Sequence, residues 1–224
     1  MQSLQEMLEE SDWWPRLDAG QQERVLAGII VRDVAAGQFV STRGTSVEGW
    51  LGVVDGLVKV STDSADGRTM TLAGIPAGGW FGEGSVLKDE PRRYDVVALR
   101  ASRIAIMPRQ IFHWLIDNSP AFSRFLLVLL NERLGHFIAA LEHQRLLGPE
   151  ARVARYLAQL FNPRLYPSTR SRLRISQSEL GLLTGLSRQR VNRALRQLES
   201  RGLLEISYGG VTVVSVERLD AFEG

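Results

Sequence analysis

The segment Ser176–Glu205, SQSELGLLTGLSRQRVNRALRQLESRGLLE, has the pattern of two short helices joined by a glycine turn. Ser176 and Glu179 have the spacing of a capping box at the start of the first helix, and Gly185 permits a tight turn. Ser187 is placed to cap the second helix, in which apolar residues recur at helical spacing and so face a core. These residues are Val191, Ala194, Leu195 and Leu198. The segment therefore predicts a helix-turn-helix.

The other face of the second helix is polar and basic near its N-terminus, the end that helix-turn-helix proteins insert into the major groove. The candidate DNA-binding residues are Ser176, Gln177, Ser187, Arg188, Gln189, Arg190, Asn192 and Arg193. Charge at this spacing is also typical of a solvated helix face. The stretch LLEISYGGVTVVS, residues 203–215, then predicts a β-hairpin, which is the wing of a winged helix-turn-helix. This combination favours double-stranded DNA as the partner.

Charge is distributed unevenly along the chain, although the whole chain has a formal net charge of only +2. Residues 150–224 hold 12 Arg, no Lys and 7 acidic residues, a net charge of +5, whereas residues 1–149 carry −3. The C-terminal part is therefore predicted to bind a polyanion. Arginine also suits the bidentate recognition of guanine and phosphate.

Composition excludes several classes of site. With 224 residues and 44% hydrophobic content, the chain can bury two cores. It has no Cys, which excludes disulfides, thiolate nucleophiles and cysteine-ligated metals. No metal site is expected from the scattered His113, His136 and His143, and no catalytic residues or enzyme activity are expected. The N-terminus is acidic and the longest apolar run, Phe125–Leu130, is too short to span a bilayer, so we expect a cytoplasmic protein without membrane contact.

Before residue 117, short β-type runs are separated by glycine turns about every 8 to 12 residues, which predicts an antiparallel sandwich or barrel. Within this part lie Phe81-Gly82-Glu83 and Pro91-Arg92-Arg93. With the winged helix-turn-helix, these motifs make the chain resemble Crp/Fnr-type transcription regulators over nearly its whole length. The resemblance implies an α+β fold with an N-terminal, jelly-roll-like antiparallel β-roll. It also implies a sensor domain at 1–117, a dimerisation helix and hinge at 118–148, and a winged DNA-binding domain at 149–224.

In this family the first two motifs form a cassette that holds a cyclic nucleotide phosphate and ribose. By similarity the effector-binding residues would be Gly82, Glu83, Gly84, Ser85 and Arg92, with Arg93 beside them. A helix N-terminus and a guanidinium make a natural anion site. Alternatively, the cassette is a retained scaffold in which Glu83 and Arg92 pair with each other.

The chain departs from the family's cyclic nucleotide pattern. Members that bind cyclic nucleotides usually carry small residues at the positions of Arg93 and Tyr94. They commonly carry Ser or Thr at the position of Asp95. Phe137 and Ile138 replace a Thr-Ser pair that accepts from the adenine amine. Leaving that amine unpaired costs about 1–3 kcal/mol. The pattern therefore favours loss of the usual cAMP response, and any effector is an unidentified small molecule; no other cofactor is expected.

Residues 120–147 predict one long helix, in which Leu130, Leu134, Phe137 and Leu141 form a heptad seam. The seam either packs on the protein's own β-roll or joins a homodimer. A dimer would suit a palindromic operator, read by Arg188, Gln189 and Arg193 at the family's reading positions.

Two functions remain open. The first is a dimeric, sequence-specific transcription regulator of the Crp/Fnr type, which also contacts RNA polymerase; the surface candidates for that contact are Arg164, Tyr166 and Arg170. The alternative is a cyclic-nucleotide-binding regulatory or scaffolding protein whose winged domain binds a protein partner. A protein-docking helix would more often present apolar anchors.

Overall fold

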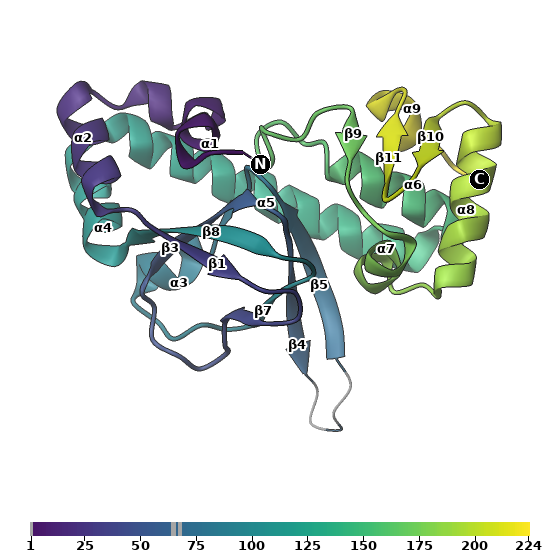
Figure 1. Cartoon of the computed structure of the whole chain (residues 1–224), viewed down its shortest axis with the longest axis horizontal. Coiled ribbons are helices and arrows are strands. Elements are labelled where there is room, and N and C mark those ends of the chain that lie inside the picture. Colours follow the sequence, from purple (N-terminus) through teal and green to yellow (C-terminus); the bar gives the residue numbers. More distant parts are fainter. Residues whose placement is uncertain (1, 64–65, 67–68) are drawn as a thin grey trace. The chain divides into compact units, whose positions relative to one another are not determined.

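The computed structural model describes residues 2–63, 66 and 69–224 (Figure 1). Contacts between residues divide the chain into two compact units. The first comprises Met1–Asn131 and Arg164–Ser168, and the second comprises Glu132–Pro163 and Thr169–Gly224.

The first unit begins with helical segments that the sequence analysis did not predict. They are α1 (Leu4–Glu10), a 3₁₀ turn (Trp14–Arg16) and α2 (Ala19–Gly28). Ser3 and Glu6 form a capping box at α1, and Asp18 and Gln21 form another at α2. Each box satisfies backbone N–H groups that a helix start leaves without an internal partner.

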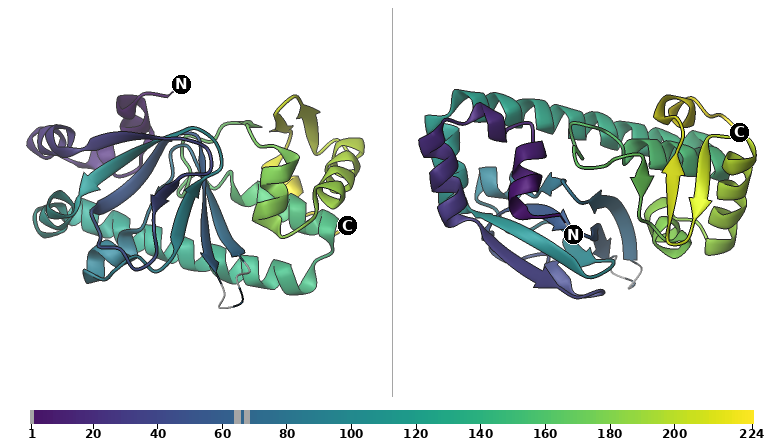
Figure 2. Two further views of the ribbon diagram at one scale, coloured as in Figure 1. Left: turned by 60° about the horizontal axis from the view of Figure 1, so that its bottom comes forward. Right: turned by 45° about the horizontal axis from the view of Figure 1, so that its top comes forward.

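The strands of the first unit form two antiparallel sheets, with the orders β1-β8-β3-β6 and β2-β7-β4-β5 among the described residues (Figures 1 and 2). Their bounds are β1 Ile30–Val34, β2 Phe39–Ser41, β3 Gly49–Asp55, β4 Leu57–Asp63, β5 Thr69–Pro76, β6 Trp80–Phe81, β7 Asp95–Ala98 and β8 Ser102–Pro108. Strands distant in sequence pair with each other, as in a rolled sheet. The predicted antiparallel β-roll is thus confirmed.

An aromatic cluster fills the interior of the first unit. The rings of Trp50 and Trp80 stack with centroids 4.4 Å apart, and Trp13 meets Trp80 edge-on at 5.4 Å. Phe122 approaches Trp13 at 5.6 Å. These rings bury large apolar areas in favourable edge and offset geometries. Two further helices complete the unit, α3 (Glu83–Lys88) and α4 (Arg109–Asn118).

The predicted long helix is confirmed as α5 (Pro120–Leu146). Its first turns bury Phe122, Phe125, Leu126 and Leu129 in the first unit. The boundary between the units falls inside this helix, after Asn131.

The second unit contains the winged helix-turn-helix that the sequence predicts. Its elements are α6 (Pro149–Gln159), β9 (Arg172–Leu173), α7 (Gln177–Thr184), α8 (Arg188–Ser200), β10 (Leu204–Ser207), β11 (Gly210–Val213) and α9 (Val216–Asp220). The three strands form an antiparallel sheet in the order β10-β11-β9. None of the helices in the described part of the chain is both long and apolar enough to cross a membrane.

Candidate nucleic-acid interface and effector site

Helix α7 begins and ends as its sequence predicts. The Ser176 hydroxyl accepts from the backbone N–H of Glu179 at 3.2 Å, and the Glu179 carboxylate accepts from the Ser176 N–H at 2.6 Å. Gly185 ends the helix in the left-handed region, with φ of 69°. A residue with a Cβ is strained there, so the glycine allows the abrupt turn into α8.

Helix α8 presents one apolar and one polar face. Ser187 caps it by accepting from the Arg190 N–H at 3.4 Å. Val191, Ala194, Leu195 and Leu198 are buried, as their spacing predicts. The predicted reading residues Arg188, Gln189, Arg190 and Arg193 are all exposed, and Asn192 is half-buried. The helix therefore offers several guanidinium groups and two amides to a partner.

The wing and the two helices line an open hollow of about 480 Å³. Gln177 and Ser176 line it from the start of α7, Arg188 and Asn192 from α8, and Tyr208 from the tip of the wing. Tyr208 is fully exposed. Beside apolar residues such as Leu195, Ile206 and Val211, the lining therefore includes hydrogen-bonding side chains of the kind that contact phosphates and base edges.

A hydrogen bond joins α8 to the wing. The Glu199 carboxylate, near the end of α8, accepts from the backbone N–H of Ile206 in β10 at 2.8 Å. The bond fixes the wing strand against the helix that carries the reading residues.

In the first unit, the predicted effector cassette lies around the start of α3. Gly82 precedes the helix with φ of 84°, and Glu83 is its first residue. The Glu83 side chain is only 3% exposed and accepts from the Trp50 indole N–H at 3.4 Å. Gly84 is half-buried and Ser85 is buried. The carboxylate thus contacts the aromatic core.

Arg92 is buried and bonded within the protein. It is 4% exposed, and its guanidinium donates to the backbone carbonyls of Gly82 at 3.1 Å and Gly49 at 2.5 Å. Burial lowers the pKa of Arg92, while the charges of Tyr94, Glu48 and Glu83 oppose that shift. The residue that would hold a phosphate therefore already has hydrogen-bond partners.

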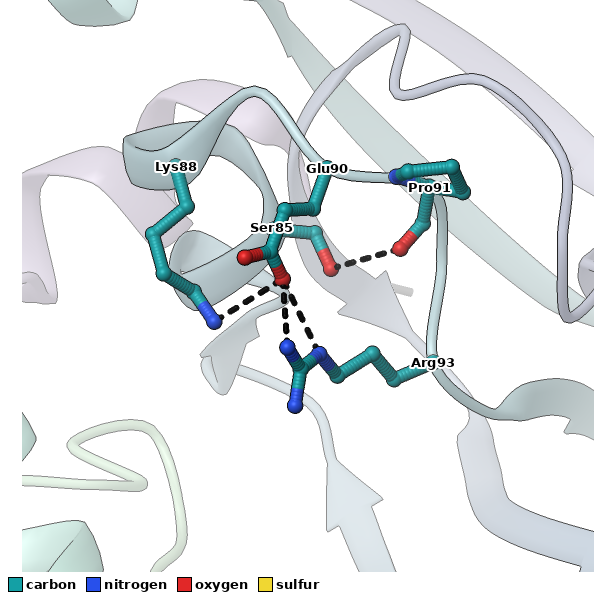
Figure 3. Close-up of polar contacts among 5 residues, drawn as sticks. All are labelled: Ser85, Lys88, Glu90, Pro91 and Arg93. Atoms are coloured by element: carbon teal, nitrogen blue, oxygen red, sulfur yellow. Dashed lines mark hydrogen bonds and ion pairs between the residues drawn. The ribbon is translucent and has the colours of Figure 1, made fainter.

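Arg93 has a different environment (Figure 3). Its side chain is exposed, and Nε and Nη2 donate to one carboxylate oxygen of Glu90 at 3.0 and 2.7 Å. Lys88 donates to the same oxygen at 3.0 Å, and Ser85 donates to the Pro91 carbonyl at 3.5 Å. The pKa of Glu90 lies below its ordinary value, chiefly because the Lys88 side chain hydrogen-bonds to the carboxylate. The hydrogen bond from Arg93 is the next largest cause. Arg93 thus belongs to a surface ion cluster.

Asp95 also has a local partner. Its carboxylate accepts from the backbone N–H of Arg43 at 2.8 Å. The carboxylate therefore ties β7 to the loop after β2. No group of His, Asp and Glu that could hold a metal ion occurs among the residues whose structure is described.

Comparison with known proteins identifies both domains. Residues 31–119 match the model of the cyclic nucleotide-binding domain, and residues 151–222 match the model of the Crp-like helix-turn-helix domain. The cyclic AMP receptor protein of Thermus thermophilus is 32% identical over 163 residues, which cover 72% of this chain and 73% of that protein.

The chain belongs to the Crp/Fnr family of transcription regulators. A CRP-like cAMP-activated global transcriptional regulator of Mycobacterium tuberculosis is 28% identical over 84% of this chain and 85% of its own. The structure of FixK2 from Bradyrhizobium japonicum shares the fold, with a TM-score of 0.71 over 88% of this chain and 98% of that one at 20% identity. As a member of the Crp/Fnr family, this chain is a DNA-binding transcription regulator.

In this Crp/Fnr protein the predicted seam residues lie along α5. Leu130 is half-buried, whereas Leu134, Phe137 and Leu141 are 59%, 44% and 51% exposed. Four more exposed apolar residues lie on α5: Leu127, Val128, Ile138 and Leu146. Leu127 lies one heptad before Leu134, so the heptad spacing could have placed it in the predicted seam.

Three other side chains change the sequence interpretation. Tyr166 is wrong as a surface candidate, because it is 3% exposed and its hydroxyl donates to the Gly74 carbonyl at 3.3 Å. The sequence analysis missed Tyr208, although a hairpin tip is exposed by its geometry. It also missed Arg196, which lies four residues after Asn192 and bonds it.

Proposed function

We propose that this Crp/Fnr protein acts as a homodimer that binds a palindromic operator in double-stranded DNA and regulates transcription in the cytoplasm. The observation that carries the proposal is the exposure of Arg188, Gln189 and Arg193 on a capped α8 beside the wing. The exposed face of α8 has charged and amide groups rather than the apolar anchors of a protein-docking helix.

Readout follows from the chemistry of these side chains. Arg188 and Arg193 can each fork onto O6 and N7 of guanine, so two guanines are expected in each half-site. The Gln189 amide both donates and accepts, which suits N6 and N7 of adenine. The half-sites are expected about 34 Å apart, one helical turn of DNA. The remaining candidates lie at the helix starts, where they can contact the phosphate backbone of the DNA and position the protein on it. They are Ser176 and Gln177 at α7, and Ser187 and Arg190 at α8.

The exposed stripe on α5 supports a dimer through residues 118–148. Leu134, Phe137 and Leu141 lie at heptad spacing with a large exposed fraction. A second α5 helix would cover this stripe by coiled-coil packing. In this proposal residues 1–117 form the sensor and 149–224 the DNA-binding domain.

Regulation is proposed not to depend on cAMP, in contrast to the relatives whose names describe them as cAMP-activated. Arg92 donates to Gly82 and Gly49, and Glu83 accepts from Trp50. A cyclic nucleotide would have to replace these bonds before it gained the family's contacts. Any effector held by Gly82, Glu83, Gly84, Ser85, Arg92 or Arg93 would be another small molecule. Arg164 and Arg170 remain candidates for contact with RNA polymerase.

The test is a binding selection on randomised duplex DNA with the full chain, with and without cAMP, followed by anisotropy titration of the enriched site. We expect a palindrome with guanines in each half-site and the same affinity in both conditions. No enriched sequence would contradict operator binding, and binding only with cAMP would contradict the regulatory part.

A further inference from the structure

One short segment of the winged part of the sequence belongs to the first unit. Residues Arg164–Ser168 lie between α6 and β9, and the residues on either side of them belong to the second unit. We call this segment the strap. A loop of the winged domain is therefore built into the unit that carries the effector cassette.

Burial and hydrogen bonds fix the strap in the first unit. Leu165 and Tyr166 are 2% and 3% exposed. The Tyr166 hydroxyl donates to the Gly74 carbonyl at 3.3 Å, and the side-chain amide of Gln2 donates to the Ser168 hydroxyl at 3.0 Å. Removing a leucine and a tyrosine ring from water favours this docking. The strap is thus an anchored segment rather than a loop that passes over the surface.

Two glycines in the turn before β6 make room for the strap. A Cβ at Gly79 would come within 3.0 Å of the Tyr166 ring, and a Cβ at Gly78 would overlap the Ser168 side chain. Because protein interiors are close-packed, a segment held against backbone at this distance has little freedom to shift. The docked strap therefore has a defined position in the first unit.

The connections on both sides of the strap are short. Residues 160–163 join α6 to the strap, and residues 169–171 join the strap to β9. An extended chain spans at most about 3.5 Å per residue, so each connection reaches only about 10–15 Å. The first connection has less slack, because the backbone N–H groups of Leu160, Phe161 and Asn162 donate back into the end of α6.

The strap adds a second attachment for the winged elements, α6 to α9. Their other attachment is through Leu147 and Gly148, which join α5 to α6. A linker of this length alone allows rotation about its backbone dihedral angles. The strap restrains that rotation, because it ties the same elements to the first unit at another place.

Such a restraint affects how a dimer binds a palindrome. Both α8 helices must meet half-sites at one separation. Restricting the orientations of the free protein lowers the entropy lost when both helices bind. The same restriction raises the cost of reaching a half-site at the wrong separation.

We propose that Leu165 and Tyr166 are positioning residues that restrain the winged elements and thereby determine which half-site separation the dimer accepts. The inference rests on the proposed dimeric binding of a palindromic operator. Neither side chain contacts DNA in this proposal, and base preference depends on the residues of α8.

The test measures binding of the full chain to two duplexes by fluorescence anisotropy. One duplex carries the operator that the wild type selects, and the other carries the same half-sites with one base pair added between them. That base pair shifts a half-site by about 3.4 Å and turns it by about a tenth of a helical turn. The wild type should bind the lengthened operator about tenfold more weakly or worse.

The decisive variant has Gly-Ser-Gly-Ser inserted after Pro163 and again after Ser168. It keeps the strap and its contacts but lengthens both connections, so the loss on the lengthened operator should fall below about threefold. The double substitution Leu165→Ser and Tyr166→Ser should release the strap and give the same relaxation. The matched control has the same insertion after Ala36, in an exposed turn of the first unit, and should keep the wild-type loss.

Urea unfolding followed by tryptophan fluorescence should be the same for the wild type and the insertion variant, because the docked strap is unchanged. If the double variant fails to fold, the insertion variant decides alone. The inference is wrong if the insertion variant loses as much affinity on the lengthened operator as the wild type does. It is also wrong if the wild type binds both duplexes equally. In both cases a palindrome selected by the wild type still supports the proposed function, whereas selection of no palindrome contradicts both proposals.

Discussion

The Nη1 atom of Arg92 donates to the backbone carbonyl of Gly82 at 3.1 Å, across the turn that begins α3. A Cβ at position 82 would overlap this nitrogen, so the guanidinium lies directly against the glycine backbone. The contact joins two motifs that lie ten residues apart in sequence. In this structure the Crp/Fnr cassette is held together by its own arginine.

Arg92→Ala is therefore expected to destabilise the first unit by about 1–3 kcal/mol, because two buried carbonyls lose a charged donor. Arg93→Ala is the matched control: its side chain is 66% exposed and its partner is a surface carboxylate, so a change below about 1 kcal/mol is expected. Urea unfolding followed by tryptophan fluorescence measures both, because all 5 Trp residues lie in the first unit. Equal losses for the two variants would contradict the bracing role of Arg92.

Calorimetric titration of the full chain with cAMP should detect no tight binding, because Arg92 and Glu83 are already bonded and Phe137 and Ile138 cannot accept from the adenine amine. The relative from Thermus thermophilus, described as a cyclic AMP receptor protein, provides the positive control. Submicromolar binding to this chain would show that the cassette opens readily.

Introducing charge on α5 tests the dimer. Leu134→Glu together with Leu141→Glu places carboxylates on the exposed stripe and should give monomers with weak operator binding. Leu26→Glu is the control, because Leu26 is also exposed, at 46%, but belongs to α2 instead of α5. Sedimentation at micromolar concentration measures the mass. A wild type that is monomeric there and yet binds an operator tightly would rule out the α5 interface.

Substitutions on α8 separate base readout from general attraction to DNA. Arg188→Ala should cost about 1–3 kcal/mol on the selected operator and much less on random DNA. Gln189→Glu should shift the preferred base between the guanines towards cytosine, because a carboxylate only accepts. Anisotropy titrations and a repeated selection provide the measurements. Equal losses on both kinds of DNA, or an unchanged base preference, would remove these side chains from direct readout.

The stability of the second unit is expected to depend on pH through His136. Burial, with smaller effects of Arg133 and His143, lowers the pKa of His136 to about 4 from an ordinary value of 6.5. The unfolded chain therefore takes up the proton first, and stability should fall as pH decreases from 6.5 towards 4. His136→Gln should flatten this slope. Hydrogen exchange of α6 amides, corrected for the intrinsic pH effect, is the measurement, and identical slopes for both proteins would contradict the assignment.

The features that the sequence predicted correctly depend on local rules. Ser176 and Glu179 satisfy helix N–H groups within one turn, and Gly185 supplies a backbone conformation that other residues avoid. The same rule applies to Ser3 and Glu6, so α1 could have been predicted from its capping box.

The remaining features depend on contacts between distant parts of the chain. The order of the strands, the burial of Tyr166 against Gly74 and the inward turn of Arg92 arise from packing in three dimensions. A motif specifies which side chain occurs at position 92, but the rotamer and the partners of that side chain depend on the surrounding sheets. The Arg196 and Asn192 spacing was visible in sequence, yet the direction of the amide required the structure.

The bond from Glu199 to Ile206 has a thermodynamic consequence. Since the wing strand is already held to α8 in the free protein, its ordering contributes little to the entropy lost when DNA enters the hollow. The heat capacity change of association should then reflect surface that is dehydrated rather than a hairpin that folds on contact.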